Sequence, residues 1–496
     1  MSGTSSDDRE RLEAQVARAR ESGQTHWIGR VEACAVHPGM APLRAAGSAD
    51  RFHFEDLDRD EFVFAFGSVD ECESAGPRRF ADVAAFRDAA ASRIAWIGDP
   101  RPEDAPTLFG GFGFEESPAA SSEWKSFPAA RFVLPAAILE HRGGIGRRIL
   151  LARVEPGTHV EAVESELAER AARLAVLMAT EESGAEAIGQ SPGERSLGWP
   201  PAPSAWPAGP EYRVRSDRSH AVFERQVDHA LAAFATGELE KVVLARSLSV
   251  DHDGELDVPG FLDRLRGLYP TCTVVAMGRG ADTFLAATPE TLVRVRGDRV
   301  MTAALAGSAP RGRDPEEDRR FGEALRADPK ERAEHAHVVD AIRDVLASHC
   351  ASIDLPDAPA LRQLFGIQHL ETPIAGRLVG DARTDVLGLV AELHPTPAVC
   401  GVPRAAAGAW LRRFEGLDRG WYAAPIGWLD LEGGGDFRVA LRSGLVRNGL
   451  GAPGGSAASQ ALLFAGAGIV EGSLPAQELV ETRIKLRALL APLTEI

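Results

Sequence analysis

The sequence predicts an α+β fold built on a large core of mixed or antiparallel β-sheet. Two observations lead to this prediction. Apolar runs punctuated by glycine, which are typical of strands, fill most of residues 27–151. In the rest of the chain, helix-like and strand-like segments are mixed without the strict βαβ alternation of a Rossmann or barrel fold. At 496 residues, the chain is long enough to bury a large core.

The N-terminal part begins with a polar leader, partly helical, over residues 1–25. Residues 26–180 are expected to supply a β-rich part of the same fold that ends in a helix from about 158. Its strand-like runs are 61–69, 93–98, 107–115, 131–139 and 147–154. Residues 181–210 are rich in Gly, Pro and Ser, which is typical of a surface connection.

The C-terminal part, residues 211–496, has stronger patterns. A helix is expected over 220–237, because its apolar residues recur at helical spacing and Gly237 follows as a stop signal. A buried strand is expected at 240–250, where both faces are largely apolar. The further helices are expected at 315–327, 329–349, 383–393 and 474–491. The further strands are expected at 282–290, 291–307 with a turn at Gly297-Asp298, 368–378, 420–431 and 436–446.

Charge and composition exclude several classes of function. The formal net charge is −17 and no Lys/Arg block occurs, which argues against binding to nucleic acid or to a membrane surface. The five cysteines form no CxxC pair, which argues against a zinc ribbon or a disulfide framework. The N-terminus is polar, and no apolar run reaches the ~20 residues of a membrane helix. We therefore expect a cytoplasmic protein with free thiols.

Two residues have the surroundings of acid–base catalysts. Lys241 lies in an otherwise apolar strand, and burial disfavours the charged form of an amine, so Lys241 is a candidate base. At the mouth of the strand it would instead reach solvent. Glu290 follows Thr288-Pro289, where a strand ends. A carboxyl group against an apolar wall has a raised pKa and can act as a general acid, although exposed glutamates are also common at turns.

Two predicted helices carry pairs of glutamates. Glu331 and Glu334 lie on one face of the helix that begins at about residue 329, and Glu478 and Glu481 lie on one face of the last helix. Two such faces can converge on one Mg²⁺ ion, which prefers carboxylate oxygens. Each helix taken alone can also be interpreted as a helix whose charged face is exposed to solvent. In addition, Glu331 stands where a capping box places its glutamate.

Ten collinear motifs resemble those of the chorismate-binding enzyme family, which includes isochorismate synthases, salicylate synthases, anthranilate synthase large subunits and aminodeoxychorismate synthases. The motifs are EKVVLAR, TPETL, LAGSAPRG, DPKERAEHAHVVD, HLETPIAG, LHPTPAVCGVP, FEGLDRGWYAAPIGW, VALRS, AGAGIVEGS and QELVETRIK. They lie between about residues 220 and 487, and FGGFGFE and FVLP match more weakly upstream. The resemblance implies a two-sheet sandwich flanked by helices, as in anthranilate synthase large subunits.

The resemblance also implies a role for each matching position. Lys241 resembles the base that activates water for attack on C2 of chorismate, and Glu290 resembles the acid that protonates the departing C4 hydroxyl. Glu334 and Glu481 resemble the ligands of a Mg²⁺ cofactor, with Glu331 and Glu478 beside them as water-mediated partners. The positions that resemble the substrate-binding groups are Tyr422, Arg442, Gly466 and Lys485 for the two carboxylates, and Gly307, Ser308 and His369 around the ring.

Three features narrow the implied reaction. Family members that add ammonia generally lack the strand lysine, so Lys241 implies water as the nucleophile and no obligate glutamine amidotransferase. Ala306 stands where aminodeoxychorismate synthases often carry a nucleophilic lysine. His394 and Thr396 in LHPTPAVCG resemble the isochorismate synthases most. We therefore expect a monomeric isochorismate synthase. The alternatives are a salicylate synthase, which adds pyruvate elimination, and a non-catalytic chorismate-binding protein.

Overall fold

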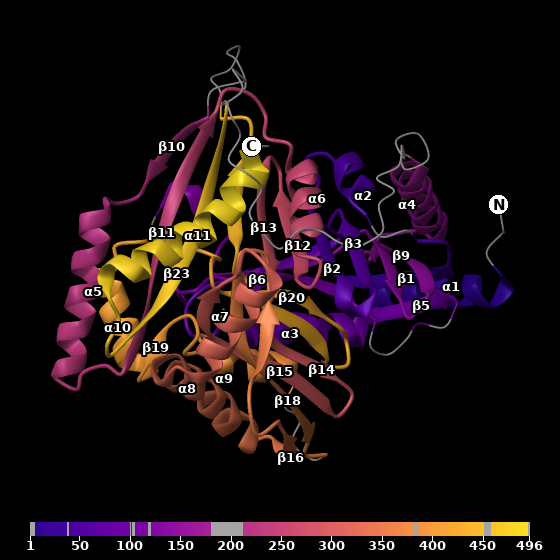
Figure 1. The fold of residues 1–496 in the computed structure, drawn as a ribbon. Helices are drawn as coiled ribbons and strands as arrows, with labels where there is room; N and C mark the ends of the chain where they lie inside the picture. Colours follow the sequence, from indigo (N-terminus) through magenta and orange to yellow (C-terminus); the bar gives the residue numbers. More distant parts are fainter. Residues whose placement is uncertain are drawn as a thin grey trace.

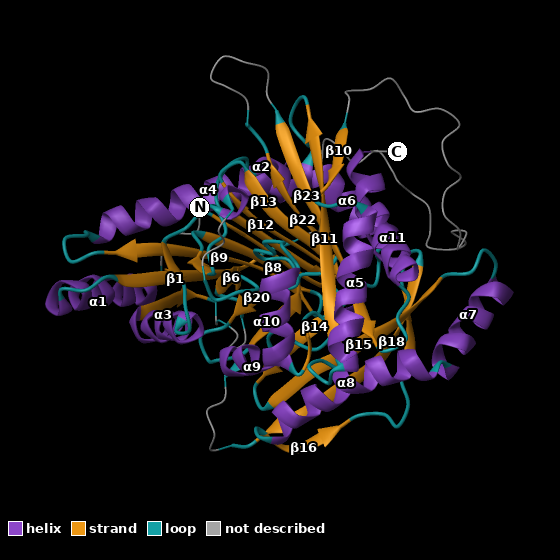
Figure 2. Ribbon diagram, turned by 90° about the vertical axis from the view of Figure 1, so that its left-hand side faces the viewer, coloured by secondary structure: helices purple, strands orange, loops and turns teal. Residues whose placement is uncertain are grey.

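The computed structural model describes residues 5–36, 39–99, 101, 105–117, 121–179, 212–380, 385–450 and 458–494. The connection expected at 181–210 lies outside these residues. Within them the chain forms two large β-sheets with helices on their outer sides (Figures 1 and 2). One apolar core contains side chains from both sheets. The predicted α+β sandwich of mixed and antiparallel strands is therefore confirmed.

The first sheet is antiparallel except for its last pair, β1 and β5. Its strands, in sheet order, are β10 (Arg213–Ser216), β11 (Lys241–His252), β23 (Ser459–Val470), β22 (Ser443–Arg447), β13 (Asp282–Thr288), β12 (Thr273–Arg279), β2 (Arg51–Asp56), β3 (Glu61–Phe66), β8 (Ala137–Arg142), β9 (Ile145–Val154), β1 (His26–Ala33) and β5 (Ile94–Gly98), with β19 (Gly401–Val402) beside β11.

The second sheet is antiparallel throughout its described strands. In sheet order they are β16 (Cys350–Asp354), β18 (Ile367–Leu378), β15 (Arg299–Pro310), β14 (Thr291–Arg296), β21 (Gly435–Val439), β20 (Pro425–Leu429), β6 (Leu108–Phe112), β7 (Ala130–Leu134) and β4 (Asp70–Ser74), with β17 (Ala360–Gln363) beside β18. Strands from both halves of the chain pair in both sheets, because β2 pairs with β12 and β6 pairs with β20.

The helices are α1 (Ser6–Ser22), α2 (Ala41–Ala45), α3 (Arg79–Arg93), α4 (Val160–Ala179), α5 (His220–Ala235), α6 (Val258–Leu268), α7 (Pro315–Ala327), α8 (Pro329–Ala347), α9 (Val386–Leu393), α10 (Arg404–Phe414) and α11 (Pro475–Thr494). Short 3₁₀ turns lie at Leu57–Arg59 and Ser122–Trp124. Helices α5, α6 and α11 pack against the first sheet, whereas α7, α8 and α9 pack against the second. Among the described residues, no helix is both long and apolar enough to cross a membrane.

Capping residues explain the sharp junction between α7 and α8. Asp328 ends α7 and caps α8, because its side chain accepts a hydrogen bond from the Lys330 N–H at 2.8 Å. Pro329 occupies the first turn of α8, where a missing N–H costs nothing. Helix α7 therefore has its predicted bounds, and α8 ends at Ala347, two residues before the predicted end.

Several segments leave one sheet and enter the other, such as the link from β3 to β4 and three crossings farther along the chain, two of which had been predicted as continuous strands. Residues 131–139 divide into β7 and β8, and residues 436–446 divide into β21 and β22. The prediction was wrong there because a strand pattern does not show to which sheet each part belongs. The second break has a local cause, since Arg442 adopts a left-handed conformation with φ 45°. The third crossing, from β13 to β14, contains Pro289 and Glu290.

Candidate active site

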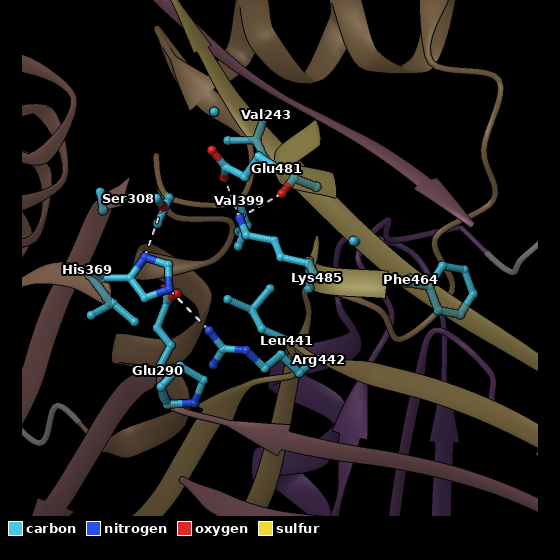
Figure 3. Close-up of a pocket in the computed structure, with 18 of the residues that line it drawn as sticks. Val243, Glu290, Ser308, His369, Val399, Leu441, Arg442, Phe464, Glu481 and Lys485 are labelled. Carbon is cyan, nitrogen blue, oxygen red and sulfur yellow. Dashed lines mark hydrogen bonds and ion pairs between the residues drawn. The ribbon is translucent and has the colours of Figure 1, made fainter. Parts of the chain in front are cut away.

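A cavity, partly open to solvent, lies between the two sheets and helices α8 and α11 (Figure 3). Residues of β11, β15, β18, β23, α8 and α11 line it, together with the loops around residues 399 and 420 and two of the sheet crossings. Its apolar wall is formed by Val243, Leu305, Ala306, Ala398, Val399, Leu441 and Phe464.

Lys241, the first residue of β11, is completely buried. Its Nζ lies 2.9 Å from Oε1 of Glu334, which lines the cavity, so the amine stands directly behind this carboxylate. Gly468 on the neighbouring strand β23 makes room for the pair, because an added Cβ there would lie 2.2 Å from Glu334 Oε1. The sequence left open whether Lys241 reaches solvent, and the structure shows that it does not.

Glu290 lies at the crossing from β13 to β14 and is 3% exposed. Burial raises its pKa to about 8, although the positive charges of Lys241, Lys485 and Arg442 act in the opposite direction. The carboxyl is therefore mostly protonated at neutral pH. A buried, protonated carboxyl in a cavity has the property required of a general acid.

The four glutamates of α8 and α11 each contact a lysine or a backbone N–H. Glu331 Oε2 accepts from the Ser308 N–H at 2.8 Å, and Glu481 Oε1 accepts from Lys485 at 2.7 Å. Lys330 Nζ donates to Glu478 at 3.2 Å and so connects the two helices. Burial and the charge of Glu481 raise the pKa of Glu478 to about 7. Burial and the charge of Glu334 likewise raise the pKa of Glu331.

These carboxylates provide the hard oxygen donors that Mg²⁺ prefers. Four carboxylates stand against the three amines of Lys241, Lys330 and Lys485, so the group favours an added positive charge. Within the described residues, however, no three acidic, His or Cys side chains are close enough to form a metal-binding group. The chemistry of the donors nevertheless fits a Mg²⁺ ion.

A hydrogen-bonded chain holds Arg442 at the cavity. Arg442 Nη2 lies 3.1 Å from His369 Nε2, and because arginine can only donate, Nε2 must be the acceptor. The imidazole proton therefore sits on Nδ1, which is 3.0 Å from Ser308 Oγ and 3.3 Å from the Gly307 carbonyl oxygen. Burial and the charges of Arg442 and Lys485 keep the pKa of His369 well below its ordinary value, so the ring is neutral.

Arg442 and Lys485 provide the positive charge of the cavity wall. Within the described residues, the buried Nη1 of Arg442 has no hydrogen-bond partner, which leaves it available to an anion. Lys485 Nζ donates to the Gly466 carbonyl oxygen at 2.9 Å. The Tyr422 ring stacks on Phe464 with centroids 5.1 Å apart, and an added Cβ at Gly466 would lie 3.0 Å from Tyr422 Oη.

The structure brings the sequence-predicted residues together at one place. Most of them line the cavity: Glu290, Gly307, Ser308, Glu334, His369, Tyr422, Arg442, Gly466, Glu481 and Lys485. Lys241 and Glu331 each contact a residue that lines the cavity, and Glu478 contacts Lys330, which also contacts Glu331. Sequence reasoning missed Arg419, which also lines the cavity. The only signal for it was its position within the motif FEGLDRGWYAAPIGW.

Comparison with known families assigns the chain to one class. A family model described as chorismate binding enzyme matches residues 14–494. The protein therefore belongs to the chorismate-binding enzyme family. It is 38% identical to the salicylate biosynthesis isochorismate synthase of Pseudomonas aeruginosa, over 87% of this chain and 83% of that one. It is 36% identical to the isochorismate synthase MenF of Bacillus subtilis, over 78% of this chain and 74% of that one.

Solved structures show the same fold. The menaquinone-specific isochorismate synthase MenF of Escherichia coli superposes with a TM-score of 0.71 at 24% identity, and the match covers 97% of this chain and 99% of that one. Anthranilate synthase component I of Streptococcus pneumoniae gives a TM-score of 0.64 at 20% identity, covering 88% and 93%. The architecture resembling anthranilate synthase large subunits is thereby confirmed.

Proposed function

We propose that the protein is an isochorismate synthase, which isomerises chorismate to isochorismate. The observation that carries the proposal is Glu290, a buried carboxyl whose pKa of about 8 keeps it protonated in a cavity that also holds Arg442 and Lys485. A dianionic substrate with a hydroxyl leaving group requires this combination of an acid and two cations. Sequence relatives named isochorismate synthases support the same reading.

In the proposed reaction, the neutral amine form of Lys241 takes a proton from water and the water oxygen bonds to C2 of the ring. The two ring double bonds shift and the C4–O bond breaks. Glu290 gives its proton to the departing hydroxyl, which leaves as water. Lys241 ends protonated and Glu290 ionised, and a proton returned through solvent restores both groups. The Lys241 amine contacts Glu334, and the Glu334 side chain in turn lines the cavity.

The substrate carboxylates are assigned to the cations of the cavity wall. We assign one carboxylate to Arg442, whose unpartnered Nη1 fits a charge-assisted hydrogen bond. Lys485 and Tyr422 contribute to the second, on the side where Gly466 leaves room. Neutral His369 orients Arg442 from behind, with Ser308 and Gly307 fixing the imidazole tautomer.

We propose Mg²⁺ as the cofactor, held by Glu334 and Glu481, with Glu331 and Glu478 as water-mediated partners. When bound, the ion supplies positive charge for the ring carboxylate. A Mg²⁺ titration of the Glu481→Gln variant tests the assignment, and we expect half-maximal activity at a higher Mg²⁺ concentration. The exposed α7 variant Glu323→Gln serves as the control. An unchanged titration of Glu481→Gln would remove Glu481 from the site.

We further propose that the chain acts in the cytoplasm as a monomer and without an amidotransferase. Water as the nucleophile requires no ammonia-supplying partner, and Ala306 in the cavity wall offers no amine for a covalent adduct. Light scattering of the purified active protein tests the oligomeric state.

The function is tested with purified protein, chorismate and Mg²⁺. We expect isochorismate as the product by chromatography, without the fluorescence of salicylate. Salicylate formation would favour a salicylate synthase instead. Binding of chorismate without any turnover would indicate a non-catalytic chorismate-binding protein.

A further inference from the structure

One edge of β11 has a gap in its backbone pairing. Along one side β11 pairs with β23 over its whole length. Along the other it pairs with β19 at Lys241 and Val242, and with β10 only from Leu248 to Asp251. The backbone groups between these two short strands are buried and need other partners.

Two side chains, Arg419 and Glu415, occupy this gap. Arg419 Nη2 donates to the Val243 carbonyl oxygen at 2.7 Å, and Glu415 Oε1 accepts from the Ala245 N–H at 2.7 Å. The two side chains also bond each other, from Nε to Oε2 at 2.8 Å and from Nη2 to Oε1 at 2.6 Å. Both are about 96% buried, at 3% and 4% side-chain exposure. The ion pair thus stands where a neighbouring strand would otherwise pair.

Arg419 also contacts two other parts of the cavity wall, one through its side chain and one through its backbone. Arg419 Nη1 donates to the Val399 carbonyl oxygen at 2.8 Å. The Arg419 carbonyl oxygen accepts from the Tyr422 N–H at 2.8 Å, in the turn that presents the tyrosine. The guanidinium carbon lies 4.3 Å from the centroid of the Phe114 ring. The Arg419 side chain therefore ties the strand of Lys241 to the loop at Val399, and the backbone of the same residue holds the turn at Tyr422.

Arg419 lines the cavity, yet its bonding differs from that of an anion ligand. All three of its nitrogens donate to protein oxygens, and Glu415 balances its charge. Arg442, by contrast, has a buried nitrogen without a partner. The charge of Arg419 is therefore balanced by Glu415 and does not serve to bind a substrate anion.

We infer that the Arg419–Glu415 pair is the positioning element of this site: it replaces a missing strand beside β11 and sets where Lys241 stands relative to the cavity wall. Lys241 lies two residues before Val243 on the same strand, so a shift of that backbone moves the amine and its contact with Glu334. The inference rests on the proposed function, because Lys241 is the base in it.

Two conservative variants separate positioning from folding. Arg419→Lys keeps the charge but loses the planar fork that bonds Val243, Val399 and Glu415 together. Glu415→Gln keeps the size of the side chain and an oxygen that can accept from Ala245, but removes the charge. Arg131→Lys is the matched control, because Arg131 is also fully buried and paired with carboxylates, at Asp50 and Glu71, outside the cavity lining.

The experiment measures kcat, KM and the stoichiometry of chorismate binding by calorimetry for the full-length chain with Mg²⁺. We expect kcat of both variants to fall about 10- to 100-fold, the loss that a misplacement of about 1 Å produces. KM should stay within about 3-fold of the wild type, with about one binding site per chain. The control should lose thermal stability and retain kcat.

Three results would overturn the inference. The first is an unchanged kcat in both variants. The second is a raised KM at unchanged kcat, which would make Arg419 a substrate ligand. The third is a loss of activity that matches a loss of binding stoichiometry, which would make the pair merely structural. A wild-type protein that forms no isochorismate would instead defeat the proposed function, so the two failures are distinguishable.

Discussion

Two glutamates of this chain show how strongly surroundings decide acidity. Glu290, buried at a sheet crossing, has its pKa raised to about 8 by the loss of solvent. Glu317, on the surface, has its pKa lowered to about 2 by hydrogen bonds from the side chain and backbone of Arg313. At neutral pH the first is mainly a proton donor and the second is ionised. A sequence motif shows which residue type occupies a position, whereas burial and hydrogen bonding in the folded protein decide whether that residue is protonated.

The pKa of Glu290 predicts how activity depends on pH. Glu290 must be protonated to act, so its contribution to kcat/KM should be lost as pH rises through about 8. Glu290→Gln cannot donate the proton and should lose about 10²- to 10⁴-fold in kcat. A pH profile of the wild type and a kcat measurement on the variant check this. Activity that rises through pH 8, or a Gln variant with near-normal turnover, would contradict the assignment.

Lys241 should contribute to chemistry without holding the substrate. The Lys241→Ala variant should form no measurable isochorismate, because no other described amine stands behind Glu334 at this strand. Chorismate binding in the presence of Mg²⁺ should remain close to that of the wild type, since Arg442 and Lys485 are unchanged. Calorimetry and product analysis measure the two effects separately. Near-normal turnover in the variant would rule out Lys241 as the base.

The types of the site residues could be predicted from the sequence, whereas their burial and protonation became known only from the structure. The sequence of the strand could not show whether Lys241 is buried. Its burial depends on packing against α8 and β23, which come from distant parts of the chain. Arg419 was missed for a related reason. Its partners at Val243, Val399 and Glu415 are separated from each other in the sequence, so no local pattern reveals the bridge.

Among the elements, helices with clear caps were predicted best. Asp328 and Pro329 defined the start of α8, and local signals were sufficient there. Helices α2, α3, α6 and α10 were not anticipated. The strand pairs β7/β8 and β21/β22 were read as single strands, because the choice between sheets is made by tertiary packing. Two of the sheet crossings hold the site residues Glu290 and Arg442, and the break in the strand at Arg442 was not predicted.

The close pairing of β11 and β23 leads to a prediction at Gly468. In Gly468→Ala the new Cβ would lie 2.2 Å from Glu334 Oε1, so the carboxylate must move away from Lys241. We expect kcat to fall by roughly 10- to 100-fold while the protein remains folded. Gly157→Ala is the control, because an added Cβ there meets no atom within 4 Å. Equal activity of both variants would show that the position of Glu334 is unimportant.

On the scale of the whole molecule, the two halves of the chain are parts of the same sheets. Strand β2 pairs with β12 in the first sheet, and β6 pairs with β20 in the second. The core between the sheets contains Phe52 and Phe109 from the first half and Trp421 and Phe437 from the second. The catalytic motifs lie in the second half, yet that half alone lacks much of its core.

We therefore predict that residues 212–496 do not fold alone. Without the first half, the edges of β12 and β20 and the apolar faces beside them are exposed. Circular dichroism and limited proteolysis should show a largely unfolded or aggregated fragment, next to a protease-resistant full-length chain. A soluble fragment with a cooperative thermal transition would contradict this view of the fold.

The central step of the proposed reaction is attack of water on C2 with Lys241 as the base, while Glu290 assists departure of the C4 hydroxyl. The most direct measurement is turnover of chorismate with Mg²⁺ in H₂¹⁸O, followed by mass spectrometry of the isochorismate. We predict that the new C2 hydroxyl carries ¹⁸O from the solvent. Isochorismate that retains the original C4 oxygen at C2 would mean that the hydroxyl migrates within the substrate, and the assigned roles of Lys241 and Glu290 would be wrong.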